Sequence, residues 1–146
     1  MDPKAYLLRY QEVQHQIEAN AQEALRLRSL AEKCTVSFDS DHSGSGDGQR
    51  IPRITEQLLR LEAQTEQLTR TLDAVRAEII AVINAVPKQH QRELLRYRYL
   101  SGMTFEEIAV RMGYSYRQTI RLHGRSLQIV AGIIAQDTRD FDSGYV

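Results

Sequence analysis

Residues 104–123 read Thr-Phe-Glu-Glu-Ile-Ala-Val-Arg-Met-Gly-Tyr-Ser-Tyr-Arg-Gln-Thr-Ile-Arg-Leu-His, and this stretch decides the fold. Thr104 followed by Glu107 has the spacing of a capping box, in which two side chains satisfy free amides of a helix's first turn. Ser115 followed by Gln118 repeats this spacing. Gly113 stands between the two boxes, where the first helix must stop and the chain must turn through a conformation that favours glycine. The stretch therefore predicts two short helices joined by a tight turn.

The apolar residues of this stretch are placed to pack the two helices together. Ala109 lies four residues before Gly113, where crossing helices would approach most closely. The apolar faces would come from Ile108, Met112, Thr119 and Leu122. The pattern is typical of a helix-turn-helix, whose second helix enters the major groove of DNA. An ordinary helical hairpin without a ligand is the alternative.

The second of these helices carries side chains that suit DNA. Tyr116, Arg117, Gln118 and Arg121 lie on or near its N-terminal face. Arginine and glutamine have donors that match guanine and adenine edges. Arg125 lies nearer the C-terminal end of the helix, where we expect it to meet phosphate. Together with Thr104 and Ser115 at the helix starts, these residues form the predicted DNA-binding site.

The charge of the chain is unevenly distributed. The 146 residues include 19 Lys or Arg and 19 Asp or Glu, so the formal net charge is zero. Residues 88–128, however, contain eight basic residues against three acidic ones, whereas residues 1–87 contain ten against thirteen. A basic segment between acidic ones indicates one polyanion-binding face.

The N-terminal half has the apolar spacing of a coiled-coil seam, alternating between four and three residues. We expect helices from about Pro3 to Cys34 and from about Pro52 to Val86, each roughly 50 Å long, folded back as an antiparallel hairpin. The seam positions are Tyr6, Tyr10, Val13, Ile17, Asn20, Ala24, Leu27, Ala31 and Cys34 in the first run, and Ile51, Ile54, Leu58, Leu61, Thr65, Leu68, Leu72, Val75, Ile79, Val82 and Val86 in the second.

Residues 35–50 are rich in Gly, Ser and Asp and predict a flexible loop. They lack the Gly-Lys-Ser/Thr ending of a phosphate-binding loop, and the acidic residues lack the spacing of a calcium-binding loop. Cys34 is the only cysteine, and the four histidines show no metal-ligand spacing. We therefore expect no cofactor, no metal ion and no enzymatic activity.

These observations predict an all-α protein. Residues 1–87 would form a long, coiled-coil-like antiparallel hairpin, residues 88–136 a helix-turn-helix domain and residues 137–146 a frayed tail. No apolar run approaches the ~20 residues of a membrane-spanning helix, so we expect no membrane association and a cytoplasmic location.

The segments 96–109 and 113–127 resemble region 4 of sigma-70-type factors, which reads the −35 promoter box and touches RNA polymerase. Nearly the whole chain resembles a family of phage and prophage proteins of Gram-positive bacteria, related to late-gene regulators of the ArpU and RinA type. The resemblance implies a phage-type transcriptional regulator in the bacterial host cell that binds double-stranded DNA and could contact RNA polymerase. Tyr116, Thr119 and Ile120 depart from the sigma pattern, so the −35 preference does not transfer.

Two other functions fit the same features. A small terminase subunit also combines a helix-turn-helix with coiled-coil assembly, but it serves DNA packaging. An interaction protein would use its C-terminal helices on polymerase without binding DNA.

The apolar face of the second long helix predicts assembly. Leu59, Ile80 and Ile83 lie off its main stripe and widen the face beyond what one antiparallel partner should cover. We expect a homodimer joined through the helical half. The alternative is that these residues pack within the same chain.

Overall fold

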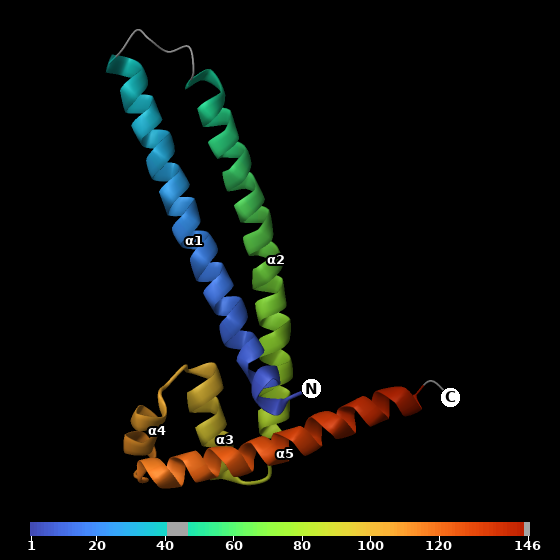
Figure 1. Cartoon of the computed structure of the whole chain (residues 1–146). Coiled ribbons are helices and arrows are strands. Elements are labelled where there is room, and N and C mark those ends of the chain that lie inside the picture. Colours follow the sequence, from blue (N-terminus) through green and yellow to red (C-terminus); the bar gives the residue numbers. More distant parts are fainter. Residues whose placement is uncertain (41–46, 145–146) are drawn as a thin grey trace. The chain divides into compact units, whose positions relative to one another are not determined.

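The protein is all-α, as predicted. The computed structural model describes the backbone of residues 1–40 and 47–144, and the side chains of these ranges except residues 36–40, 47 and 143. No strand occurs in these ranges. In chain order the elements are α1 (Pro3–Ser40), the 3-10 turn η1 (Asp47–Gln49), α2 (Arg50–Asn84), α3 (Gln89–Leu95), the π-helical turn η2 (Arg96–Leu100), α4 (Phe105–Met112) and α5 (Tyr116–Ser143) (Figure 1).

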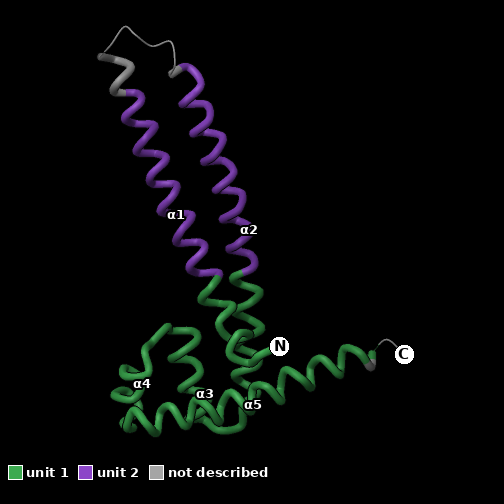
Figure 2. The backbone as a smooth tube through the Cα atoms, viewed as in Figure 1, with its two compact units in different colours: residues 1–12, 72–146 green, residues 13–71 purple. Residues whose placement is uncertain are grey.

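The elements gather into two compact units, to which α1 and α2 both contribute (Figure 2). Unit 1 consists of Met1–Glu12 and Leu72–Val146, and unit 2 consists of Val13–Thr71. The contacts therefore place the boundary within the long helices, whereas the sequence led us to expect it near residue 87. The first turns of α1 and the last turns of α2 share a core with the C-terminal helices.

The core of unit 1 explains this boundary. Ile79, Ile83 and Val86 of α2 have no exposed surface, and they pack in one apolar cluster with Leu7 of α1 and Val130 of α5. The other buried members of the cluster are Tyr10, Val75, Val82, Leu94, Leu95, Tyr99, Ile108 and Leu122. Removing such a face from water is the main stabilising contribution to a small domain.

Two of the residues that widened the apolar face of the second long helix belong to this region. Ile83 is fully buried inside unit 1, and Ile80 is partly buried. Leu59, in contrast, is 61% exposed. For Ile83 the structure follows the alternative of packing within the same chain, because α2 enters a multi-helix core at this point.

Unit 2 is an antiparallel pair formed by the remaining parts of α1 and α2. The Asn20 amide donates to the Thr65 hydroxyl at 3.5 Å, and the Arg28 guanidinium lies 4.0 Å from the Glu62 carboxylate. The two helices are therefore antiparallel, because Arg28 follows Asn20 in α1 whereas Glu62 precedes Thr65 in α2. Both predicted polar seam residues face each other in this pair.

The helix ends differ from the predicted ones where no residue forces a stop. α1 continues from Cys34 to Ser40, so part of the segment expected as a loop is helical. Residues 41–46 of the expected loop lie outside the described ranges. α5 continues to Ser143 through residues expected to be frayed. Residues 137–143 contain no Gly or Pro, and the Thr138 hydroxyl donates to the Ile134 carbonyl at 3.0 Å.

The turn η2 ties α1 to the C-terminal helices. A π-turn leaves backbone groups outside the regular α-helical ladder. The Arg98 carbonyl accepts a hydrogen bond from the Gln11 side-chain amide at 2.7 Å. Gly102, with φ 70°, then reverses the chain before α4. A left-handed residue at this point favours glycine.

A buried polar pair lies between η2 and α5. The Tyr99 hydroxyl and the Nε2 atom of His123 are 2.6 Å apart, and the Phe105 ring lies edge-on to His123 with centroids 4.8 Å apart. Burial raises the pKa of the Tyr99 hydroxyl to about 12 and lowers the pKa of the His123 imidazole to about 4. The pair is therefore neutral at pH 7.

We predict that lowering the pH from 7.5 to 5 reduces the free energy of unfolding by about 2 kcal/mol through His123. The unfolded chain binds a proton at this site below the ordinary pKa of 6.5, whereas the folded chain does so only near 4. Acid therefore favours the unfolded state. Urea unfolding followed by circular dichroism at several pH values measures the slope.

His15 provides the matched control because it is exposed on α1. His123→Gln should flatten the dependence between pH 7.5 and 5, and His15→Gln should leave it unchanged. An unchanged slope in His123→Gln would assign the dependence to other groups.

Candidate nucleic-acid interface

The turn between α4 and α5 is fixed by Gly113. This residue has φ 72° and ψ 30°, in the left-handed region. The Tyr114 amide donates to the Ala109 carbonyl at 2.9 Å, and the Gly113 amide donates to the Val110 carbonyl at 3.3 Å. These two bonds make a Schellman motif, which satisfies the free carbonyls at the end of α4. The predicted role of Gly113 is confirmed.

The start of α5 carries a complete capping box. The Ser115 hydroxyl accepts a hydrogen bond from the backbone amide of Gln118 at 3.1 Å. In return, the backbone amide of Ser115 donates to the side-chain Oε1 atom of Gln118 at 2.9 Å. At the start of α4 the Thr104 hydroxyl accepts from the Glu107 amide at 3.2 Å. Thr104 thus caps α4, but no hydrogen bond between the Glu107 side chain and the Thr104 backbone amide occurs among the described residues, so only half of the predicted capping box forms.

Small and apolar side chains pack α4 against α5. Ile108 and Ala109 of α4 are buried, as are Thr119 and Leu122 of α5. The Thr119 hydroxyl donates to the Ser115 carbonyl at 2.9 Å, so this polar group enters the core with a hydrogen bond. A buried hydroxyl without such a partner would be costly. Four of the five packing residues predicted from the sequence are therefore buried, and the fifth, Met112, is partly buried.

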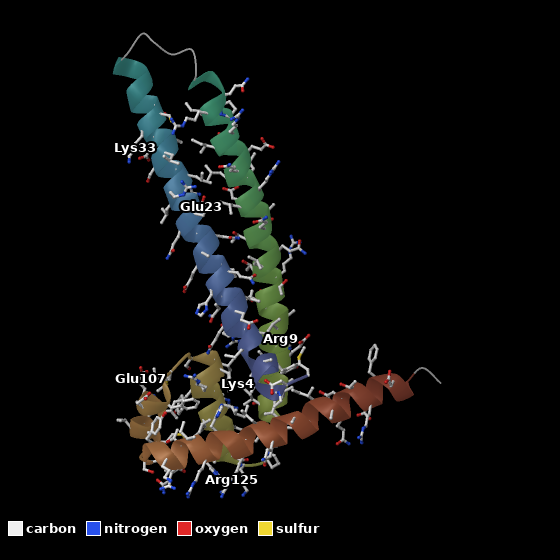
Figure 3. The ribbon with its side chains drawn as sticks, viewed as in Figure 1. Lys4, Arg9, Glu23, Lys33, Glu107 and Arg125 are labelled. Carbon is white, nitrogen blue, oxygen red and sulfur yellow. The ribbon has the colours of Figure 1, made fainter. Side chains whose placement is uncertain are left out.

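This burial leaves the other side of α5 in water. Arg117, Gln118, Arg121 and Arg125 are exposed, and the Tyr116 side chain is 52% exposed. Figure 3 labels Arg125 on the outer edge of this part of α5. The first turn of α5 contains no acidic residue. The positive end of the helix dipole and the arginines therefore act in the same sense on an approaching anion.

Six of the eight basic residues of the segment fall into two groups. Arg92, Arg96 and Arg98 are used inside unit 1, since they donate to the Val86 and Pro87 carbonyls, to the Asn84 side chain and to the Met103 carbonyl, respectively. In the part of the chain that the structure describes, Arg117, Arg121 and Arg125 have no ion-pair partner within 4.0 Å. Within the described ranges, three of the eight basic residues of the segment therefore lie on α5 with their donors free for a ligand.

A groove of about 260 Å³ runs beside this face, and we call it the α5 groove. Three predicted site residues line it, namely Gln118, Arg121 and Arg125. The remaining lining residues are His90, Tyr114 and Leu122. His90 precedes Arg121 by about thirty positions in the chain, so no local pattern in the sequence could have linked them. Tyr114 directly follows Gly113, so the sequence alone could have indicated it as a neighbour of the site.

The structure places the predicted site residues differently. Arg117 and Arg121 are four residues apart and project from the same side of α5. Gln118, Arg121 and Arg125 border the α5 groove, whereas Thr104, Ser115 and Tyr116 do not line it. Ser115 and Thr104 contribute by holding the helix starts.

Other classes of site find no support in the described ranges. No three His, Cys, Asp or Glu side chains lie close enough there to hold a metal ion. Within the same ranges no helix has the length and apolarity needed to cross a membrane.

Comparisons with protein-family models, curated proteins and solved structures find no match to this chain.

Two glycines of this region should respond oppositely to alanine. Gly113→Ala should lower the free energy of unfolding by about 1–2 kcal/mol, because the left-handed conformation is strained for a residue with a Cβ atom. Gly124→Ala should raise it by up to about 1 kcal/mol, because a Cβ atom there meets nothing within 4 Å and alanine favours the helix. Urea unfolding of both variants measures the difference. Equal effects would contradict the assigned turn.

Proposed function

We propose that the protein binds double-stranded DNA with the N-terminal half of α5 in the major groove, as a sequence-specific transcriptional regulator of the phage type that its sequence resembles. One observation carries the proposal. The exposed side of α5 presents three arginines without ion-pair partners in the described part of the chain, on a helix start that holds no acidic residue. Such a surface suits a polyanion.

The spacing of the side chains supports reading of base edges. A guanidinium group can donate two hydrogen bonds to O6 and N7 of one guanine. Arg117 and Arg121 stand one helical turn apart on the same side of α5, so both could reach neighbouring base pairs. Tyr116 and Ile120, which are 52% and 37% exposed, flank them and could contact thymine methyl groups.

The capping box changes the part that Gln118 can take. Its Oε1 atom already accepts from the Ser115 amide, so the side-chain orientation is held and the Nε2 donor is the group left to face a ligand. Recognition of adenine uses both an amide acceptor and an amide donor. We therefore assign Gln118 a single donated hydrogen bond to a base or a phosphate.

The α5 groove suits the phosphate backbone. Arg125 borders it from α5, one turn beyond the base-reading Arg121, and His90 borders it from α3. Contacts of this kind set the position of a protein on the duplex and carry no sequence information. Arg125 would contribute to affinity on any sequence, and Arg117 to the choice of sequence.

A second candidate function rests on α4. Val110 is 85% exposed, and it borders a surface hollow together with Met103, Glu106, Glu107 and Arg111. An apolar side chain in this position favours contact with a protein, and RNA polymerase is the partner that the sigma resemblance suggests. This contact could accompany DNA binding or, in an interaction protein, replace it.

The main test selects duplexes from a random library with the full chain and measures affinity by fluorescence anisotropy. Arg117→Ala should cost about 1–3 kcal/mol on the selected duplex and less on a random one. Arg125→Ala should weaken both similarly and make the dependence on salt less steep, because it removes a phosphate contact.

Arg60→Ala is the matched control, since it removes one positive charge from an exposed arginine of unit 2 that pairs with Glu56 at 2.8 Å. It should leave both affinities within about twofold. Equal losses for Arg117→Ala on both duplexes would remove its role in base reading. A chain that binds neither duplex would refute DNA binding and leave the α4 contact as the remaining function.

Gln118→Glu separates helix capping from DNA contact. Glutamate at this position completes a capping box with serine, so helicity and the free energy of unfolding should be preserved. DNA affinity should fall at least about tenfold, because a donor is replaced by a negative charge. Circular dichroism and anisotropy on the same sample measure the two effects. Unchanged affinity would place Gln118 outside the interface.

A further inference from the structure

Unit 2 contains a groove of about 750 Å³ between its own parts of α1 and α2, and we call it the unit 2 groove. Asn20 and Thr65 line it, both are partly buried, and the Asn20 amide donates to the Thr65 hydroxyl at 3.5 Å. The small side chains of Ala21 and Ala24 line the α1 side. Small residues leave room above the seam that the two helices do not fill.

Two leucines stand exposed at this face. Leu25 lines the unit 2 groove and is 62% exposed, and Leu59 is 61% exposed. Leu59 precedes Glu62 by three residues and Glu66 by seven, and both glutamates line the groove, so the helical repeat places Leu59 on the same side of α2.

The antiparallel register brings the two leucines to one level. Counting from the Asn20–Thr65 pair, five residues up α1 reach Leu25 and six residues back along α2 reach Leu59. The two exposed side chains therefore lie at about the same level on one face of the pair, one on each helix, and we call them the leucine patch. Single exposed leucines are common on protein surfaces, whereas two exposed leucines on neighbouring helices present a larger apolar area.

The rest of unit 2 lacks a second layer. Of the hydrophobic side chains described in it, Leu27 and Ile54 are buried, whereas Ile17, Leu58 and Leu68 of the seam stay partly exposed. Helices reach a stable core by burying their apolar stripes against another layer. A pair of helices that buries so little needs an additional partner.

The charges at the rim select the kind of partner. Arg28 and Arg70 lie on the rim of the unit 2 groove together with Glu62 and Glu66, so the rim is neutral in total and carries both signs. A polyanion gains nothing from such a rim. Arg28 lies 4.0 Å from Glu62 of its own chain, whereas Glu66 and Arg70 have no ion-pair partner within 4.0 Å among the described residues. A second copy of the same face presents a glutamate and an arginine that can pair with these two.

We propose that unit 2 is a homodimerisation surface, in which the leucine patches of two chains pack face to face. The four helical segments then form one bundle, and the leucines fill the grooves above Asn20 and Thr65. This inference is independent of DNA binding. Two linked copies would raise the avidity for repeated half-sites.

Sedimentation equilibrium of the full chain at micromolar concentration, with a reducing agent to keep Cys34 free, tests the proposal. The wild type should show twice the mass of the 16.8 kDa chain. Leu25→Glu and Leu59→Glu should each raise the dissociation constant at least about tenfold, because a charge would be buried in an apolar interface. Both leucines are exposed in the single chain, so these variants should keep their helical circular dichroism.

Ala19→Glu is the matched control, because Ala19 is exposed about 120° round α1 from Leu25 and does not line the groove. It should remain dimeric. A monomeric wild type, an oligomer larger than two, or a dimer unaffected by both leucine substitutions would overturn the proposal. So would dissociation of Ala19→Glu to the same extent, which would show a general effect of charge on the helix.

Discussion

The arrangement of unit 1 depends on α5 having to bury one face along its first half. Thr119, Leu122 and Val130 turn into the common core, so α5 cannot rotate about its axis without exposing them. This constraint leaves Arg117 and Arg121 in water, since they lie on the opposite side of the same turns. The composition of the exposed surface is therefore a consequence of what the core requires.

Most polar groups that enter this core have hydrogen-bond partners, and among the described residues the exception is Gln91, whose buried Oε1 atom has none. The hydroxyls of Thr119 and Ser126 donate to carbonyls one turn earlier in α5, at 2.9 and 2.7 Å. Tyr99 and His123 satisfy each other at 2.6 Å. The Tyr99–His123 pair adds no charge to the core, because burial keeps both rings neutral at pH 7. The interior thus stays uncharged beneath a basic outer face.

The arginines show how one residue type serves two purposes. Arg92 fastens the chain after α2 by donating to the Val86 and Pro87 carbonyls at 2.7 and 2.8 Å, and Arg98 stacks over the Phe105 ring at 4.2 Å. Their donors are used in holding helices together. Arg125 instead borders the α5 groove. A count of basic residues cannot distinguish these roles, because the partners come from other elements.

The sequence by itself determined the all-α class and the local joints, namely the Ser115–Gln118 capping box and the left-handed turn at Gly113. Hydrogen bonds across three to five residues and the φ angle of one glycine decide these features, so a short window contains all the information. Only the tertiary structure decided that Ile83 is core while Leu59 remains outside, and that His90 joins the α5 groove. Burial depends on which distant helices meet, and the periodicity of one helix does not contain that information.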